Sequence, residues 1–284
     1  MQAQLIRLNW LEAEDSLQKL CHPKKGFPSP LTNLIDQVFM TLACIPWNDN
    51  ILGFPGSVPT HSLAKYATTG WLTDEHETQM LELLKQDLAR SGRASGIEVQ
   101  PIHFIPLLSD AYKDGDNAYL TKQHYTWLRH LGHACETGLV TKIPMIANTG
   151  NNQHWVAIII DFADKVVWYG DSMDAVSPPK HLRNVLDWWI QKSLPTMNTM
   201  FPYQKMPITE QEDTYSCGLL AWNALSSFLL EDVKIFSPNS IAEERLKVLL
   251  SVAERHHAKV RAISQWQGKI TSKRLTICSR PSRK

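Results

Sequence analysis

The chain has 284 residues, 43% hydrophobic and 20% charged, which is enough to fold as one large domain or two small ones. No run approaches the ~18 consecutive apolar residues of a membrane span, and Glu12, Glu14 and Asp15 stand where a secretory signal needs an apolar stretch. The net charge of +1, from 29 Lys and Arg against 28 Asp and Glu, gives no reason to expect nucleic-acid binding.

The first hundred residues are predicted to contain a linker and two helices. Residues 22–30 (HPKKGFPSP) are rich in Pro and Lys, which is typical of a linker. A helix with one apolar face is expected to begin at Thr32 or Asn33, both of which are good capping residues. A second amphipathic helix is expected to begin at Thr73 and to end before a turn at 91–96.

The middle of the chain has the pattern of a β-hairpin. Gln153–Asp161 (QHWVAIIID) is a short, apolar and β-branched run, typical of a strand buried inside a sheet. The run KVVWYGDS, over 165–172, meets the same criteria, and only a short turn separates the two. We therefore predict two antiparallel neighbouring strands.

Helices are predicted on both sides of these strands. One follows Ser177-Pro178-Pro179, and the nearly continuous apolar run Gly218–Leu230 predicts a buried helix. Residues 201–209 fit a further strand, and a last helix over about 240–261 begins with the capping-box residues Ser240 and Glu243. Strands in the middle with helices before and after them predict an α+β domain.

Charge divides the chain into a body and a tail. Residues 267–284 contain six Lys and Arg and no acid, whereas residues 1–266 carry a net charge of −5. Such a basic block is typical of a disordered terminus, with a localisation signal or a polyanion contact as alternatives. We expect a partly helical extension over 1–57, a domain over 58–266 and a disordered basic tail over 267–284. A mildly acidic body suits a partner with a basic contact face.

Cysteine usage favours reduced thiols and a nuclear or cytoplasmic protein. The cysteines are odd in number and form no CxxC pair: Cys21, Cys44, Cys135, Cys217 and Cys278. Cys217 lies where the polar loop EQEDTYS meets the predicted buried helix, and the positive end of a helix dipole favours the thiolate form. The neighbouring Gly218 would let the backbone turn closely. Position alone fits a nucleophile and a buried structural cysteine equally well.

A cysteine nucleophile requires a base and a group that orients the base. His154 begins the first predicted strand and Asp171 ends the second, so antiparallel pairing would bring the two side chains to one edge of the sheet. Gln211, six residues before Cys217, offers an amide donor for a developing oxyanion. The alternatives are a strand-end histidine beside an unrelated turn aspartate, and a surface glutamine.

These residues resemble the motifs of the Ulp1/SENP-type proteases of ubiquitin-like proteins, within the adenovirus-protease-like clan of cysteine peptidases. The resemblance rests on His154-Trp155, on Asp171 and on Gln211 six residues before Cys217-Gly218. It is supported by Trp71-Leu72-Thr73-Asp74, which looks like the WLxD motif of the family, and by the strand-like run 143–146. It covers roughly residues 58–230, or as far as 266 when the last predicted helix is included.

The resemblance implies an α+β, papain-like fold and cleavage after the C-terminal Gly-Gly of a ubiquitin-like modifier, SUMO first. By analogy Cys217 is the nucleophile, His154 the base, Asp171 its orienting group and Gln211 the oxyanion donor. The same analogy assigns substrate binding to Trp155, which would cover the diglycine tunnel, and to Trp71, Asp74 and Gly218. Packing in the sheet is the alternative for Trp155, and helix capping or core packing is the alternative for Trp71 and Asp74.

The chain departs from the family pattern just before the nucleophile. Family members usually have Asp where this chain has Ser216, and EQEDTYS replaces the commoner QQxNxxD. Neither change removes a group assigned to catalysis, so we expect activity. Ubiquitin or NEDD8 as the modifier, a non-catalytic modifier-binding protein and an acetyltransferase are the alternative functions.

No cofactor and no metal are expected. His130, His133 and Cys135 have no fourth ligand at a suitable spacing, and the chain has neither a Gly-rich phosphate loop nor an HExxH motif. The expected partners are a ubiquitin-like modifier and its conjugates, with no membrane, no nucleic acid at the catalytic domain, and a monomeric state.

Overall fold

The computed structural model describes residues 2–21, 30–150, 154–196 and 200–278. The chain divides into two compact units, one formed by Met1–Thr68 with Arg245–Lys284 and the other by Thr69–Glu244. No helix in the described ranges is both long enough and apolar enough to cross a bilayer.

The unit Thr69–Glu244 is built around a four-stranded sheet in the order β1-β2-β3-β4. The strands are β1 (Lys142–Asn148), β2 (Trp155–Asp161), β3 (Val166–Gly170) and β4 (Tyr203–Lys205). β2 pairs antiparallel with β1 and β3, whereas β4 runs parallel to β3. The predicted hairpin is confirmed. The strand predicted over 201–209 forms a ladder only at β4.

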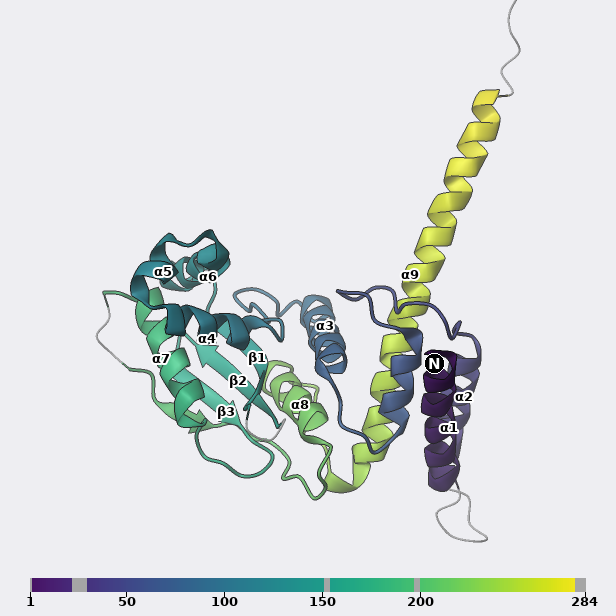
Figure 1. The fold of residues 1–284 in the computed structure, drawn as a ribbon, viewed down its shortest axis with the longest axis horizontal. Helices are drawn as coiled ribbons and strands as arrows, with labels where there is room; N and C mark the ends of the chain where they lie inside the picture. Colours follow the sequence, from purple (N-terminus) through teal and green to yellow (C-terminus); the bar gives the residue numbers. More distant parts are fainter. Residues whose placement is uncertain (1, 22–29, 151–153, 197–199, 279–284) are drawn as a thin grey trace, which may run out of the picture. The chain divides into compact units, whose positions relative to one another are not determined.

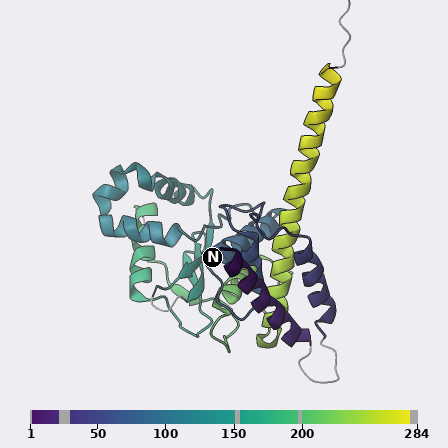
Figure 2. The same cartoon turned by 45° about the vertical axis from the view of Figure 1, so that its right-hand side comes forward.

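Helices cover both faces of this sheet (Figure 1 and Figure 2). Every residue of β2 is buried, and its side chains from 155 to 160 alternate between two hydrophobic clusters. Val156, Ile158 and Ile160 pack in the cluster formed with α4 (Phe104–Asp114), α6 (Thr126–Glu136) and α7 (Lys180–Ser193). Trp155, Ala157 and Ile159 pack in the cluster formed with α3 (Asp74–Arg90) and α8 (Cys217–Leu229).

The α+β architecture is confirmed, and three of its helices match predicted ones. These are α3, α7 and α8, each within a few residues of the expected bounds. Between α3 and β1 the structure adds α4, α5 (Asp116–Thr121), the short 3-10 helix η2 (Gln123–Tyr125) and α6, a stretch for which no element was predicted.

The other unit contains α1 (Gln2–Cys21), α2 (Thr32–Ala43), the 3-10 helix η1 (Thr60–Ala67) and α9 (Ile241–Cys278), which follows the short 3-10 helix η3 (Pro238–Ser240). α2 begins where it was predicted, and the linker predicted over 22–30 lies outside the described residues except for residue 30. The buried guanidinium of Arg245 joins α9 to η1 by donating to the carbonyls of Tyr66 (3.2 Å) and Lys65 (2.8 Å).

The last helix is longer than expected. α9 was predicted to end near 261, but the backbone is helical as far as Cys278. No proline occurs between 241 and 278, and the single Gly268 costs a helix only about 1 kcal/mol. Pro281 is the first residue of the segment that is strongly incompatible with a helix interior.

Candidate active site

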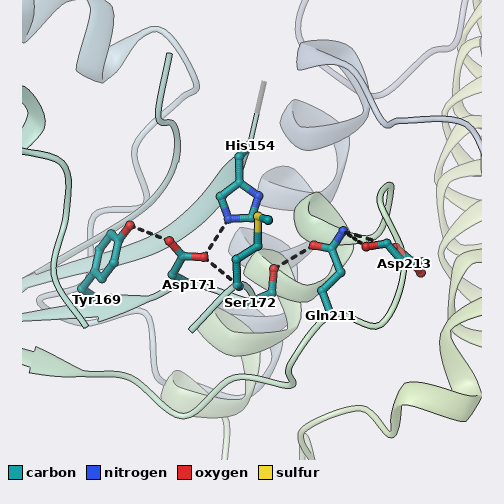
Figure 3. Close-up of polar contacts among 7 residues, drawn as sticks. His154, Tyr169, Asp171, Ser172, Gln211 and Asp213 are labelled. Carbon is teal, nitrogen blue, oxygen red and sulfur yellow. Dashed lines mark hydrogen bonds and ion pairs between the residues drawn. The ribbon is translucent and has the colours of Figure 1, made fainter. Parts of the chain in front are cut away.

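His154 and Asp171 meet at one edge of the sheet. His154 directly precedes β2 and Asp171 directly follows β3, and the antiparallel pairing of these strands brings the two side chains together. The imidazole Nε2 and the carboxylate Oδ1 are 2.7 Å apart (Figure 3), and only 8% of His154 and 6% of Asp171 is exposed. This is the juxtaposition expected from the two strand ends.

Two further groups hold the Asp171 carboxylate. The hydroxyl of Tyr169 donates to Oδ2 at 3.0 Å (Figure 3). The backbone N–H of Met173 donates to Oδ1 at 2.8 Å. Burial raises the pKa of Asp171, but the hydrogen bonds from His154, Met173 and Tyr169 prevail and leave that pKa below its ordinary value. Sequence reasoning missed Tyr169, although it lies two residues before Asp171, where a strand repeats its face.

The thiol of Cys217 completes the group. Cys217 is the first residue of α8 and is buried, and its side chain is hydrogen-bonded to the imidazole of His154. Burial lowers the pKa of His154, but the hydrogen bonds with Asp171 and Cys217 outweigh it and raise that pKa to about 9. The imidazole is therefore held in its charged form between the Asp171 carboxylate and the sulfur of Cys217, an arrangement that suits nucleophilic catalysis.

Gln211 connects the strand end that carries Asp171 to the loop before Cys217. Its backbone N–H donates to the Ser172 carbonyl at 2.8 Å, and its side-chain Oε1 accepts from the Ser172 hydroxyl at 3.0 Å. Its Nε2 donates to the carbonyl of Asp213 at 2.7 Å and lies 3.3 Å from Oδ1 of the same residue (Figure 3). The amide thus lies between the residue after Asp171 and the loop that leads to Cys217.

The other predicted site residues occupy different surroundings. The indole of Trp155 is buried and donates to the Leu72 carbonyl at 3.3 Å, which joins the start of β2 to the WLTD segment. Trp71 is 46% exposed, and Asp74 is an exposed residue at the start of α3. The side chains of Trp71 and Asp74 are accessible to a partner, whereas that of Trp155 is covered by its neighbours.

The structure corrects the reason for Gly218. The sequence indicated a backbone turn, but Gly218 lies within the first turn of α8 and is buried. A Cβ at this position would lie 1.9 Å from Oε1 of Glu77 on α3, which is itself fully buried. A side chain at 218 would therefore force the Glu77 carboxylate to move, so glycine suits the close packing of α3 against α8.

The weak metal candidate gains no support. Among the described residues, no three His, Cys, Asp or Glu side chains cluster as metal ligands would. His133 instead lies 3.4 Å from Glu136 on the same helix. Cys135 is buried in α6, and burial raises the pKa of its thiol to about 12, so it is an unreactive thiol unlike a nucleophile.

An α+β fold that brings a Cys, a His and an Asp together at one edge of its sheet is the arrangement of a cysteine peptidase. The profile of the Ulp1 protease family, C-terminal catalytic domain, matches residues 71–254, so the chain belongs to the Ulp1 protease family. The matched range lies inside the predicted 58–266. No curated protein sequence matches the chain.

Solved structures share the fold. The Ulp1-like SUMO protease catalytic domain of Chaetomium thermophilum is 12% identical, with a TM-score of 0.58 over 78% of this chain and 89% of that one. SUMO protease Ulp1 with its catalytic cysteine oxidised to a sulfenic acid is 18% identical, with a TM-score of 0.56 over 80% and 96%. The Ulp1 protease domain in complex with Smt3, the yeast orthologue of SUMO, is 17% identical, with a TM-score of 0.54 over 82% and 99%.

Proposed function

We propose that this cysteine protease cleaves after the C-terminal Gly-Gly of a ubiquitin-like modifier, with SUMO as the preferred modifier. The observation that carries the proposal is the buried chain of contacts from Asp171 through His154 to Cys217. The similarity to solved SUMO proteases supports SUMO as the first modifier to test. The reaction would release the modifier from a lysine side chain or mature its precursor.

The geometry supports a two-step acyl transfer. The thiol proton of Cys217 passes to His154, and the resulting thiolate attacks the carbonyl carbon of the terminal glycine. Gln211 and the backbone N–H of Cys217 stabilise the oxyanion. The imidazolium of His154 gives its proton to the departing amine as the C–N bond breaks, leaving a thioester. His154 then takes a proton from water, which attacks the thioester, and the C–S bond breaks to release the modifier and the thiol.

Substrate binding is proposed for the residues around this centre. Trp155, at the start of β2 beside the nucleophile, would cover the passage that admits the diglycine, and Gly218 would border it. The exposed Trp71 and Asp74 would contact the folded body of the modifier. A carboxylate at that position suits a basic contact face on the partner.

A reducing compartment is proposed for the protein, which we expect to act as a monomer in the nucleus or cytoplasm. Four cysteines whose side chains the structure describes are free: Cys21, Cys44, Cys135 and Cys217. Reduced thiols are the usual state there, and catalysis by Cys217 requires it.

Hydrolysis of C-terminal fluorogenic derivatives of SUMO, ubiquitin and NEDD8 tests the proposal. We expect SUMO to be cleaved with the highest kcat/KM and the activity to be lost in Cys217→Ala. Faster cleavage of ubiquitin or NEDD8 would replace SUMO as the modifier. Binding of a modifier without turnover by the wild type would indicate the non-catalytic alternative and contradict the proposed activity.

A further inference from the structure

One carboxylate organises the loop between Gln211 and Cys217. Oδ1 of Asp213 accepts from the backbone N–H groups of Tyr215 (2.9 Å) and Ser216 (2.8 Å). Oδ2 accepts from the Ser216 hydroxyl at 2.5 Å, and Oδ1 also lies 3.3 Å from the Gln211 amide nitrogen. A half-buried side chain that holds four groups of its own loop fixes the shape of that loop.

We propose that Asp213 is a positioning residue for the reaction, acting through both Gln211 and Cys217. This proposal rests on the proposed function for its kinetic readout. Asp213 would touch neither the substrate nor the reacting atoms. It would set where the oxyanion donor and the nucleophile stand relative to His154.

The contact with Cys217 runs through Ser216. Ser216 is fully buried and is the residue from which α8 begins, yet its hydroxyl does not cap the helix. The hydroxyl donates to Asp213 instead, so the last residue before the nucleophile is held by both its backbone N–H and its side chain. Loss of the carboxylate would free the start of α8 and with it the thiol.

The contact with Gln211 fixes an amide that would otherwise rotate. The terminal torsion of a glutamine is broad, so the direction of its N–H bonds depends on its partners. Ser172 holds the oxygen, and one N–H of Nε2 points to Asp213, where it is shared between the carbonyl at 2.7 Å and Oδ1 at 3.3 Å (Figure 3). The other N–H is left for the oxyanion. Both ends of the amide are thereby set before a substrate arrives, which is the preorganisation that oxyanion stabilisation requires.

This arrangement explains the departure from the commoner QQxNxxD pattern. In register with that pattern, Asp213 stands where the family has Asn, and Ser216 stands where it has Asp. The 2.5 Å contact between Asp213 and Ser216 shows that the two positions face each other. The chain therefore keeps one carboxylate in this pair, but the carboxylate is at 213 and not at 216.

Exchanging the two partners provides the test. S216D alone would place two carboxylates together, which is unfavourable unless they share a proton. D213A would remove the carboxylate, and the double variant D213N/S216D would restore one carboxylate with an amide partner. E212A is the matched control, because Glu212 is an exposed acidic neighbour in the same loop.

We expect D213A and S216D to lower kcat by about 10- to 100-fold at pH 8 with KM changed by less than about twofold. S216D should regain part of its activity near pH 6, where the two carboxylates can share a proton. D213N/S216D should return to within about fivefold of the wild type, and E212A should equal it. Recovery of activity in the double variant would show that the single substitutions lower kcat through the lost pairing and not by unfolding the protein.

A second readout needs no modifier. The rate at which iodoacetamide alkylates Cys217 at pH 6.5, measured by mass spectrometry of its peptide, reports the contact of the thiol with His154. We expect this rate to fall at least about fivefold in D213A and S216D and to recover in the double variant. Unchanged alkylation in both single variants, or no recovery in the double variant, would overturn the role of Asp213. Absence of turnover in the wild type would contradict only the proposed function.

Discussion

Nε2 of His154 and Oδ1 of Asp171 form a 2.7 Å hydrogen bond that is almost closed to solvent. The bond joins the residue before β2 to the residue after β3, so the antiparallel pairing of these strands is what assembles the site. The same bond explains why the pKa of the imidazole is raised to about 9 despite burial, which by itself lowers that pKa.

Replacing Asp171 with Asn should change the pH dependence of catalysis. For the wild type we expect the alkaline fall in kcat/KM near pH 9, where His154 loses its proton. In Asp171→Asn the amide removes the negative charge, so this fall should move about 1–2 pH units lower, and activity at pH 8 should drop about 10- to 100-fold. A pH profile of the variant with the alkaline limb still near 9 would contradict this assignment.

The same pair should stabilise the fold over a defined pH window. The folded-state pKa of His154 is about 9 against an ordinary 6.5, so its contribution is complete below pH 6.5 and is lost as the pH rises toward 9. The pKa of Asp171 is lowered from 3.8, so its contribution is present above that pH and is lost in more acidic solution.

Urea unfolding of Asp171→Asn should therefore show a loss of about 1–3 kcal/mol between about pH 4.5 and 6.5, shrinking as the pH approaches 9. Asp187→Asn is the matched control, because Asp187 accepts from the Tyr203 hydroxyl and pairs with Arg183, so its partners include no histidine. A loss in Asp171→Asn that is independent of pH would refute the linkage.

Tyr169→Phe should separate orientation of the site from stability. The change removes one hydrogen bond to the Asp171 carboxylate, which we expect to cost about 1–2 kcal/mol of unfolding free energy and to lower kcat about two- to fivefold. Tyr203→Phe is the matched control, because Tyr203 lies in the same sheet and its hydroxyl donates a similar bond, 2.9 Å long, to Asp187. Urea unfolding of the two variants should show comparable losses of stability. Kinetics should show a reduced kcat in Tyr169→Phe alone. An equal reduction of kcat in both variants would mean that Tyr169 has no specific role in the site.

Gly218→Ala should destabilise the packing of α3 against α8. The new methyl group would fall 1.9 Å from Glu77 Oε1, and overpacking of this kind costs about 1–3 kcal/mol or more. A double-mutant cycle with Glu77→Ala isolates the clash: Gly218→Ala should cost at least about 1 kcal/mol less in the Glu77→Ala background. Equal costs in the two backgrounds, measured by urea unfolding, would assign the effect of Gly218 to something other than this contact.

The places of the central residues were predictable because each marks the end of a regular element, whereas their catalytic roles were implied only by the resemblance to the protease family. Cys217 follows a polar loop and opens an apolar helix, and His154 and Asp171 bound the two strands of a hairpin. Antiparallel pairing of the two strands is enough to bring His154 and Asp171 to the same edge of the sheet.

Other features depend on contacts that a local pattern does not contain. The need for Gly218 arises from Glu77, which lies on another helix, and the burial of Arg245 arises from carbonyls of η1. Asp213 has no apolar periodicity around it, and only the folded loop shows which donors it collects. α9 extends beyond the end expected for it, because a run of basic residues without proline does not itself stop a helix.

The most direct test of the proposed function is covalent capture by a SUMO probe that carries an electrophile in place of the scissile bond. Intact mass and peptide mapping should show one SUMO adduct on the wild type, attached at Cys217, and none on Cys217→Ala. The adduct should form more slowly in His154→Ala, because the imidazolium that stabilises the thiolate is gone. No adduct on the wild type, or an adduct that persists on Cys217→Ala, would contradict the account.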